Sequence, residues 1–519
     1  MMKTTHRSPS PHTGARRVPH AVVIGAGLGG LAVALRLLAA GMRVTVLEGQ
    51  PSPGGRAGRI QDGGFTFDTG PSLITMRDLI EDLFAVADTS MGDQLRLHAL
   101  DPFYRICWEN ERRTFLFSGD RDAMREQIGQ FDLGDGERYD DFVAASRRIY
   151  EQALLVAGER TFLRLSDFLA FMPKMVRLGA LRTVDGFVGH FFHEPHVRQA
   201  FDFHPLFIGG APFRVPAVYA ALAYLQIAGG VWYAEGGVYA LVDALARLVE
   251  SRGMLHVNCR VTDILHDGQR VSGVQTEHGE TIEADYVVSN ADVVTTQRML
   301  GRQSRTPSLT MSCYLLYLGT NREFPQLHHH TLLVGQEYRR FIRDVTIDGR
   351  VPANLSLYVH APSRTERAMA APGGEAISAL LPVPNLAHAH DWSRLEPMLS
   401  ERILSLLESD AGLGLSGLHD SIVVRHSWTP LDFRERFGAV VGNAFGPEPT
   451  LFQSAYFRQP NRDRRLSGLY YVGAGTHPGA GIPGVLMTAS VTATLLQQDE
   501  ADLWKCRPSF KIPFRPPSR

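Results

Sequence analysis

A glycine-rich turn near the start of the chain constrains its fold more than any other feature. The run Ala21-Val22-Val23-Ile24 is wholly apolar, which is typical of a strand buried on both faces of a parallel sheet. It leads into Gly25-Ala26-Gly27-Leu28-Gly29-Gly30, and residues 31–40 continue with Ala and Leu at helical spacing. A second apolar segment, residues 43–47, ends at Glu48. This order predicts one βαβ unit.

The glycines of this turn have separate physical tasks. Gly25 permits a tight turn, Gly27 lets the backbone approach a pyrophosphate, and Gly30 allows the helix to pack closely. The helix amino terminus adds free N–H groups and the positive end of a dipole. Glu48 is placed to accept hydrogen bonds from the ribose hydroxyls of an adenosine. The unit predicts a dinucleotide site, to which Ala26 and Gly29 of the same loop also belong.

A second glycine loop, Pro53-Gly54-Gly55-Arg56-Ala57-Gly58, follows Glu48 closely. A strand-like segment, Phe65-Thr66-Phe67, comes next. A loop with an arginine so near the nucleotide site suits a cofactor with a second, larger half. The alternative is a hairpin turn with a surface arginine. The cofactor-binding residues predicted here are Gly54, Gly55 and Arg56.

A third glycine-rich run lies between an apolar strand at residues 469–472 and an apolar helix at residues 485–497. Residues 479–484 match the pattern G-x-G-x-x-G, but they do not form a second dinucleotide site. No strand immediately precedes Gly479, Pro483 lies inside the pattern, and neither a further strand nor its acid follows. A single nucleotide site without a separate NAD domain favours a bound flavin over a dissociable nicotinamide. The cofactor-binding residues predicted in this run are Gly473, Gly475, Thr476, Gly481, Ile482 and Pro483.

These segments, in this order, resemble the bacterial-type phytoene desaturases and related carotenoid desaturases, within the amine-oxidase-like flavoproteins. The long run Gly473 to Gly484 is the most specific likeness, and the likeness extends from about Ala21 to Gln497. It implies FAD as cofactor and a long, neutral polyene as substrate. It also implies hydride transfer from an allylic C–H to flavin N5, with loss of a proton. One departure is Ala234-Glu235, where many members have proline and a basic residue, and this bears on which carotenoid is used.

The expected fold class is α/β, with a Rossmann-like FAD-binding domain and an α+β substrate domain carrying a helical, apolar insertion. The FAD-binding domain is expected from three segments, 21–120, 243–300 and 456–500. Residues 301–455 are assigned to the substrate domain, and residues 121–242 to the helical region facing substrate or membrane. Residues 1–20 and 501–519 are expected to form basic tails, the first of them disordered.

One stretch of the helical region has a clear apolar face. Pro173 predicts a kink in this stretch, whose apolar residues recur at helical spacing while its charged residues share the other side. The apolar residues are Phe168, Phe171, Met172, Met175 and Val176, and the charged ones are Asp167, Lys174 and Arg177. This face could line a hydrocarbon tunnel, lie on a bilayer or pack inside the protein.

Few polar groups are candidates for catalysis, because a neutral polyene offers no charged handle. The candidates are Asp167 in the apolar stretch, His204 among aromatic residues, and His477 beside the closing glycines. Each has a structural alternative that is favoured. Asp167 can stabilise a helix amino terminus beside Ser166, and the two histidines can be hydrogen-bonded core residues.

Charge and cysteine content exclude several other classes. The chain has 53 Lys and Arg against 54 Asp and Glu, without the basic excess expected of a nucleic-acid binder. Its four cysteines are too scattered for a disulfide framework or a C-x-x-C metal site, so we expect a reducing cytoplasm and no metal. The longest uncharged run, residues 215–234, is interrupted by Pro216 and two glycines, so no transmembrane helix is predicted.

The resemblance implies a lipophilic polyene drawn from membrane, peripheral attachment to the inner face of the cell membrane, and quinone or oxygen as electron acceptor. Several alternatives stay open at this point. They are a desaturase of neurosporene or diapophytoene type, a redox-neutral carotenoid isomerase, a flavin amine oxidase, and a flavin-free protein like the GDP-dissociation inhibitors.

Overall fold

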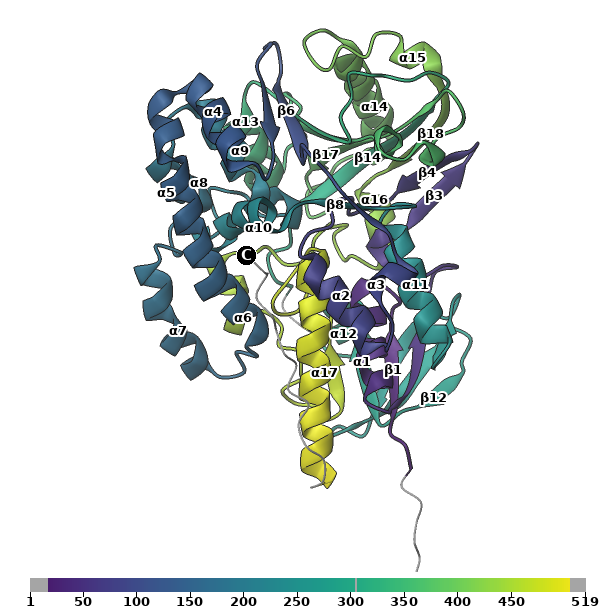
Figure 1. Ribbon diagram of the computed structural model, residues 1–519. Helices are drawn as coiled ribbons and strands as arrows, with labels where there is room; N and C mark the ends of the chain where they lie inside the picture. Colours follow the sequence, from purple (N-terminus) through teal and green to yellow (C-terminus); the bar gives the residue numbers. More distant parts are fainter. Residues whose placement is uncertain (1–16, 304–305, 505–519) are drawn as a thin grey trace, which may run out of the picture.

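The computed structural model describes residues 17–303 and 306–504, and a five-stranded parallel sheet forms the first part of the molecule (Figure 1). The strand order is β19-β13-β1-β2-β9, and every neighbouring pair is parallel. Strands from the first, middle and last parts of the sequence lie side by side. The α/β, Rossmann-like fold built from discontinuous segments is therefore confirmed. The strands are β1 His20–Ile24, β2 Arg43–Leu47, β9 Met254–His256, β13 Tyr286–Ser289 and β19 Leu469–Tyr471.

Helix α1, Leu28–Ala39, lies at the centre of this part. It is apolar on almost every side, and such a helix is stable only when it is surrounded. It packs against α11, Tyr239–Glu250, and against the long α17, Ile482–Trp504 (Figure 1). Helix α17 begins three residues before the predicted start. A second apolar core joins the parallel sheet to an antiparallel sheet of β10 Val261–His266, β11 Val271–Thr276 and β12 Thr281–Glu283.

A seven-stranded sheet forms the second part, in the order β18-β14-β17-β16-β15-β6-β7. Strands β6 and β7 precede residue 120, so the prediction that residues 21–120 belong wholly to the FAD-binding domain is wrong for them. Their apolar side chains extend the core of the second sheet instead. The strands are β6 Tyr104–Trp108, β7 Thr114–Phe117, β14 Ser312–Thr320, β15 His330–Val334, β16 Leu357–His360, β17 Glu375–Val383 and β18 Ile422–Trp428.

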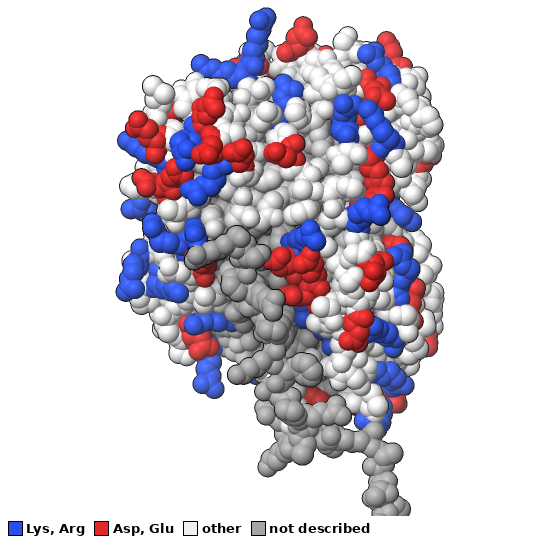
Figure 2. All heavy atoms as spheres, viewed as in Figure 1, with Lys and Arg blue, Asp and Glu red and all other residues white. Residues whose placement is uncertain are grey.

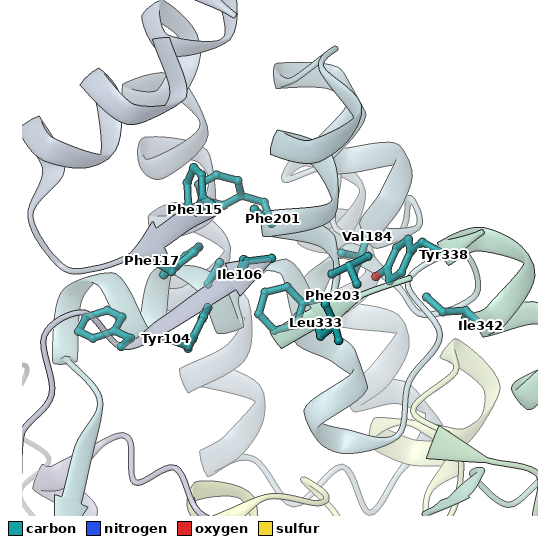
Figure 3. Close-up of a cluster of buried hydrophobic side chains, with 14 of the residues drawn as sticks. Tyr104, Ile106, Phe115, Phe117, Val184, Phe201, Phe203, Leu333, Tyr338 and Ile342 are labelled. Carbon is teal, nitrogen blue, oxygen red and sulfur yellow. The ribbon is translucent and has the colours of Figure 1, made fainter. Parts of the chain in front are cut away.

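A helical lobe fills residues 121–229, on the left in Figure 1. Its helices pack through a continuous aromatic cluster against β6 and β7, and Figure 3 shows Phe115 and Phe117 close to Phe201. None of the described helices is long and apolar enough to cross a membrane. The helices are α4 Arg121–Phe131, α5 Leu133–Ile149, α6 Leu155–Glu159, α7 Leu165–Arg177, α8 Val184–Phe191, α9 Pro195–Asp202 and α10 Ala221–Gly229.

Helix α7 is the predicted amphipathic helix, with Pro173 inside it. Phe168, Phe171 and Met175 are buried, whereas Leu169 and Val176 are exposed. One apolar side of α7 therefore packs against the rest of the protein, and a second set of apolar side chains is exposed to solvent.

Shorter elements connect these parts. Two small antiparallel sheets pair β3 with β4 and β5 with β8. These strands are β3 Arg59–Asp62, β4 Phe65–Asp68, β5 Leu97–Ala99 and β8 Trp232–Ala234, and the remaining α-helices are α2 Arg77–Val86, α3 Met91–Gln94, α12 Val293–Met299, α13 Tyr338–Arg343, α14 Trp392–Glu408, α15 Leu418–Ser421 and α16 Pro430–Phe437. Cys506 and most residues of both predicted tails lie outside the described residues.

Candidate functional site

One cavity of about 480 Å³ joins the two parts of the molecule. Its glycine end lies at the carboxyl edge of the parallel sheet, where Gly25, Gly27, Glu48 and Arg56 line it. Its apolar end lies against the seven-stranded sheet and the helical lobe. The lining there is mainly hydrophobic and includes Phe203, Leu206, Phe207, Leu222, Leu225, Leu332, Leu333, Phe341, Leu357 and Leu380.

The first glycine loop leaves no room for side chains. A Cβ atom on Gly30 would lie 2.0 Å from the carbonyl oxygen of Gly25, and Gly25 itself has φ +91°. A Cβ atom on Gly27 would lie 2.9 Å from Nδ2 of Asn290. No described side chain caps the amino terminus of α1, so its first N–H groups are available to an anionic ligand. This is the geometry that a pyrophosphate needs.

Glu48 is buried at the carboxyl end of β2, beside this loop. Its Oε2 accepts a hydrogen bond from the Ala26 N–H at 2.8 Å, and its Oε1 accepts one from the Gln50 N–H at 2.9 Å. Each carboxylate oxygen keeps a further lone pair for a hydroxyl donor. The two backbone bonds fix the carboxylate where a ribose would lie.

Asn290 is the point where the first and third glycine runs meet. A Cβ atom on Gly473 would lie 2.5 Å from Oδ1 of Asn290, and one on Gly29 would lie 3.2 Å from Cα of Gly473. Sequence reasoning missed Asn290 as a site residue. The available signal was its position directly after the buried strand β13, because ligands bind at the carboxyl ends of parallel strands.

Several buried polar groups beside the cavity lack partners among the described residues. Nε of Arg56 has none, although Nη2 lies 3.4 Å from the Asn443 carbonyl oxygen. Both side-chain polar atoms of Asn443 and Oγ1 of Thr476 are also unsatisfied. Burial lowers the pKa of Arg56 from its usual value. Because unsatisfied buried groups are costly, these residues fit a bound cofactor rich in acceptors and donors, as FAD is.

The third glycine run places only some of its predicted residues at the cavity. Gly473, Gly481 and Ile482 line it, at the amino terminus of α17. Gly475 packs on Val293, since a Cβ atom there would lie 2.8 Å from that side chain, and Pro483 lies in the first turn of α17.

The remaining predicted cofactor residues divide in the same way. Gly54, Gly55 and Gly29 line the cavity, whereas Ala26 and Gly30 support the first loop from behind.

His204 lies one layer behind the apolar end. It is fully buried, and its Nε2 lies 2.8 Å from the Tyr104 hydroxyl, which lies 2.8 Å from Oε1 of Gln226. Gln226 lines the cavity. Burial lowers the pKa of His204 to about 4, so the ring is neutral at pH 7. Its contacts are those of a residue that holds Tyr104 and Gln226 in place.

The other two catalytic candidates do not line the cavity. Oδ2 of Asp167 accepts a hydrogen bond from the Arg164 N–H at 3.2 Å, which is a helix-capping role. His477 is buried, its carbonyl accepts a hydrogen bond from Asn461 at 3.1 Å, and its ring meets Phe162 edge to face. Both positions match the structural alternatives.

The departure at Glu235 also lies away from the cavity. Its carboxylate is 3.4 Å from Arg96 and 3.6 Å from His98, and all three side chains are exposed. This acidic residue therefore faces a basic surface neighbour and does not contact a bound hydrocarbon directly.

Several uncharged polar groups also line the apolar end. Sequence reasoning missed them, because they come from separate elements with no shared motif. They are Ser72, Gln226, Tyr338, Ser356 and Tyr358.

Comparison with known proteins agrees with this site. Residues 28–496 match the family of flavin containing amine oxidoreductases. The chain is 41% identical over 490 residues to the lycopene-forming phytoene desaturase of Pseudescherichia vulneris, covering 92% of this chain and 99% of that protein. It is 35% identical over 494 residues to the neurosporene-forming phytoene desaturase of Rhodobacter capsulatus, with coverage of 92% and 93%.

Solved structures show the same fold. A putrescine oxidase redesigned in its cofactor binding superposes with a TM-score of 0.61 at 13% identity, covering 93% of this chain and 99% of that one. The chain thus belongs to the flavin-containing amine oxidoreductases, together with the bacterial phytoene desaturases, and is an FAD-dependent oxidoreductase.

Proposed function

We propose that this protein desaturates a long polyisoprenoid hydrocarbon such as phytoene in carotenoid biosynthesis. The observation that carries the proposal is the continuity of the cavity. One end has the glycines and Glu48 that a dinucleotide requires. The other end is a hydrophobic chamber lined by Phe203, Phe207 and Leu225. The phytoene desaturases among its relatives support the same substrate class.

The residues of the site have distinct tasks in this reaction. Bound FAD supplies an acceptor for the hydride that leaves an allylic carbon. Gly27 and Glu48 would hold its adenosine half, and the unsatisfied polar atoms of Arg56, Asn443 and Thr476 would be available to its remaining polar atoms. The apolar end excludes water and orients a chain that offers nothing for an ion pair. Delocalised allylic charge lowers the demand for a strong base, in keeping with the uncharged Tyr358 and Gln226.

Expression in cells that accumulate phytoene tests the proposal. We expect coloured products whose masses fall by two hydrogens per step, and a purified protein with a flavin absorption spectrum. Products of unchanged mass would indicate a carotenoid isomerase instead. The number of steps distinguishes neurosporene from lycopene as the end product. Absence of bound or bindable FAD would contradict the whole assignment.

The substrate class also requires a route from membrane to cavity, and we propose that α7 and the neighbouring loop provide it. Leu169, Val176 and Phe452 are 57%, 62% and 74% exposed, and Phe457 links the loop to α7 through a ring contact with Phe168 at 5.2 Å. Basic side chains gather over α7 at the lower left of Figure 2. An apolar surface with basic neighbours is typical of a bilayer-docking face.

A second, smaller cavity of about 80 Å³ lies next to the first, on the side of α6. Leu154, Leu155 and Tyr219 line it, and Ile208, Leu222 and Ala480 line both cavities. The smaller cavity therefore adjoins the apolar end on one side and α6, which precedes α7 in the chain, on the other. We propose that the polyene passes this way.

Flotation with anionic phospholipid vesicles tests the docking face. The variant with Leu169→Ser, Val176→Ser and Phe452→Ser should lose vesicle binding at least tenfold while keeping its flavin. Leu133→Ser is the matched control, because Leu133 is 79% exposed but lies at the start of α5. Equal loss in the control, or binding unchanged in the triple variant, would refute the route.

We propose quinone or oxygen as the acceptor that reoxidises the flavin. Anaerobic turnover with a soluble quinone distinguishes the two. Turnover that continues without oxygen assigns the quinone, and turnover that stops without oxygen assigns oxygen. Failure with both acceptors would refute this proposal.

A further inference from the structure

Three buried histidines converge where the inner strands β15 and β16 of the seven-stranded sheet end, outside the flavin site. His330 begins β15 and His360 ends β16, and the antiparallel register places the two residues directly opposite each other. Paired residues of neighbouring strands present their side chains on the same face. His329 precedes the strand, and its carbonyl accepts a hydrogen bond from the Ala361 N–H at 2.9 Å. Strand pairing thus determines the cluster.

The ring nitrogens of these residues point toward a common centre. One nitrogen from each ring lies within 4.8 Å of those of the other two, and Nε2 of His329 lies 3.2 Å from Nε2 of His360. Nε2 of His330 is buried and has no hydrogen-bond partner among the described residues. An unsatisfied nitrogen in the protein interior is costly, so its position beside two other imidazoles points to a ligand.

In two of the rings, the nitrogen that points away from the common centre is hydrogen-bonded to a neighbouring hydroxyl. Nδ1 of His330 lies 2.7 Å from the Tyr358 hydroxyl, and Nδ1 of His329 lies 2.5 Å from Oγ1 of Thr365. Metal-ligating histidines are usually oriented in this way, with the second ring nitrogen hydrogen-bonded to an outer residue.

We propose that His329, His330 and His360 bind one divalent transition-metal ion, with zinc as the preferred metal. Imidazole nitrogen suits zinc, and three histidine ligands leave one position of a tetrahedron for a further donor. The cluster is not part of the flavin chemistry. Its ligands bridge β15 and β16, whose residues Leu332, Leu333 and Leu357 line the apolar end of the cavity.

The same geometry gives the ion a structural role. Tyr358 joins the cluster to the cavity wall, because its hydroxyl also lies 2.5 Å from Oγ of Ser72 and both residues line the cavity. A bound ion would fix His330, and through it Tyr358, at the place where substrate lies. Tyr233 links the cluster to Glu366. The Tyr233 ring contacts His329, and its hydroxyl donates a hydrogen bond to the Glu366 carboxylate at 2.7 Å.

Metal analysis of untagged holoenzyme tests the inference. After incubation with zinc and removal of the excess, we expect about one zinc per chain, and X-ray absorption should show nitrogen ligands at about 2.0–2.1 Å. His330→Ala should lower the zinc content at least tenfold. His278→Ala is the matched control, since this histidine lies on an exposed turn. It should keep the wild-type content.

A second measurement does not depend on the folding of the variant. Zinc should raise the midpoint of thermal unfolding of the wild-type protein and of His278→Ala, because the ion binds the folded state. Less than about 0.1 zinc per loaded wild-type chain, or an absorption spectrum without histidine ligands, would overturn the proposal. Flavin content and desaturation are separate readouts, so failure here leaves the proposed reaction intact.

Discussion

The glycine end of the cavity is built from backbone, whereas the apolar end is built from side chains. At the glycine end, Gly30 and Gly473 admit no added atom, and Glu48 is held by two backbone N–H groups. At the apolar end, Phe203, Phe207 and Leu225 come from the helical lobe and pack across the second sheet. Backbone geometry tolerates no substitution, while a hydrophobic wall tolerates many that preserve volume. Cofactor binding and substrate choice therefore depend on different kinds of residue.

The largest effect is expected from Gly30→Ala. The added methyl group would lie 2.0 Å from the Gly25 carbonyl oxygen, and neither backbone segment can move without displacing the other. We expect protein without bound flavin, measured by absorbance after purification. Gly129→Ala is the control, because Gly129 lies in α4 with nothing within 4 Å of an added Cβ. It should keep its flavin and gain up to about 1 kcal/mol of stability. Flavin retained in Gly30→Ala would show that the glycine end tolerates an added side-chain atom, contrary to the contrast drawn above.

A bulky residue at the apolar end should separate the two functions. Leu222 lines both cavities, so Leu222→Trp narrows the passage between them. We expect desaturation to fall by about 100-fold through this obstruction, with flavin content unchanged. Product analysis and the flavin spectrum of the same preparation measure both. Leu133→Trp, on the surface, should change neither, and a loss of flavin in Leu222→Trp would contradict the division between the two ends.

An isosteric change at the glycine end should weaken hydrogen bonding without changing the shape of the site. Glu48→Gln keeps the shape but replaces one acceptor oxygen with an N–H donor, which opposes the N–H of Ala26 or Gln50. A lost charge-assisted bond and an unsatisfied buried donor cost about 2 kcal/mol. We expect FAD to bind about 30-fold more weakly, measured by titration of the apoprotein. Affinity equal to the wild type would show that Glu48 does not contact the ribose.

An effect on stability alone, without loss of cofactor or activity, is expected from Asp202→Asn, behind the apolar end. Burial raises the pKa of Asp202 to about 8, against 3.8 for an ordinary aspartate, while the hydrogen bond from Tyr338 acts in the opposite direction. The folded protein keeps a proton that the unfolded chain releases. The contribution of Asp202 to the free energy of unfolding is therefore fully present below about pH 4 and is lost as pH rises to 8, by about 1 kcal/mol per pH unit.

Asparagine does not titrate in this range, so its contribution to stability does not change with pH. The variant should therefore lose less stability than the wild type between pH 5 and 8. Thermal unfolding at several pH values measures this difference. Asp68, whose pKa burial raises to about 7, adds a similar slope in both proteins and cancels in the comparison. Parallel curves for variant and wild type would show that Asp202 is ionised in the fold.

The same contrast explains what could be predicted from the sequence. The strands at residues 21–24 and 43–47, the turn between them and Glu48 follow from local chemistry, because glycine, apolar runs and a terminal acid occupy consecutive positions. Asn290 escaped detection because its partners, Gly25 and Gly473, lie far away in the sequence. The three-histidine cluster was missed for the same reason. His329 and His330 are adjacent, but strand pairing brings His360 to them.

The contact between Gly29 and Gly473 has a consequence for biosynthesis. A ribosome makes the first half of the cofactor cradle early, and the loop that completes it emerges only after more than 400 further residues. Until then α1 lacks α17, the helix that covers it, and its apolar surface stays open to the surroundings. The apolar surface is therefore prone to aggregation until that point, and FAD can complete the fold only after this loop has been made.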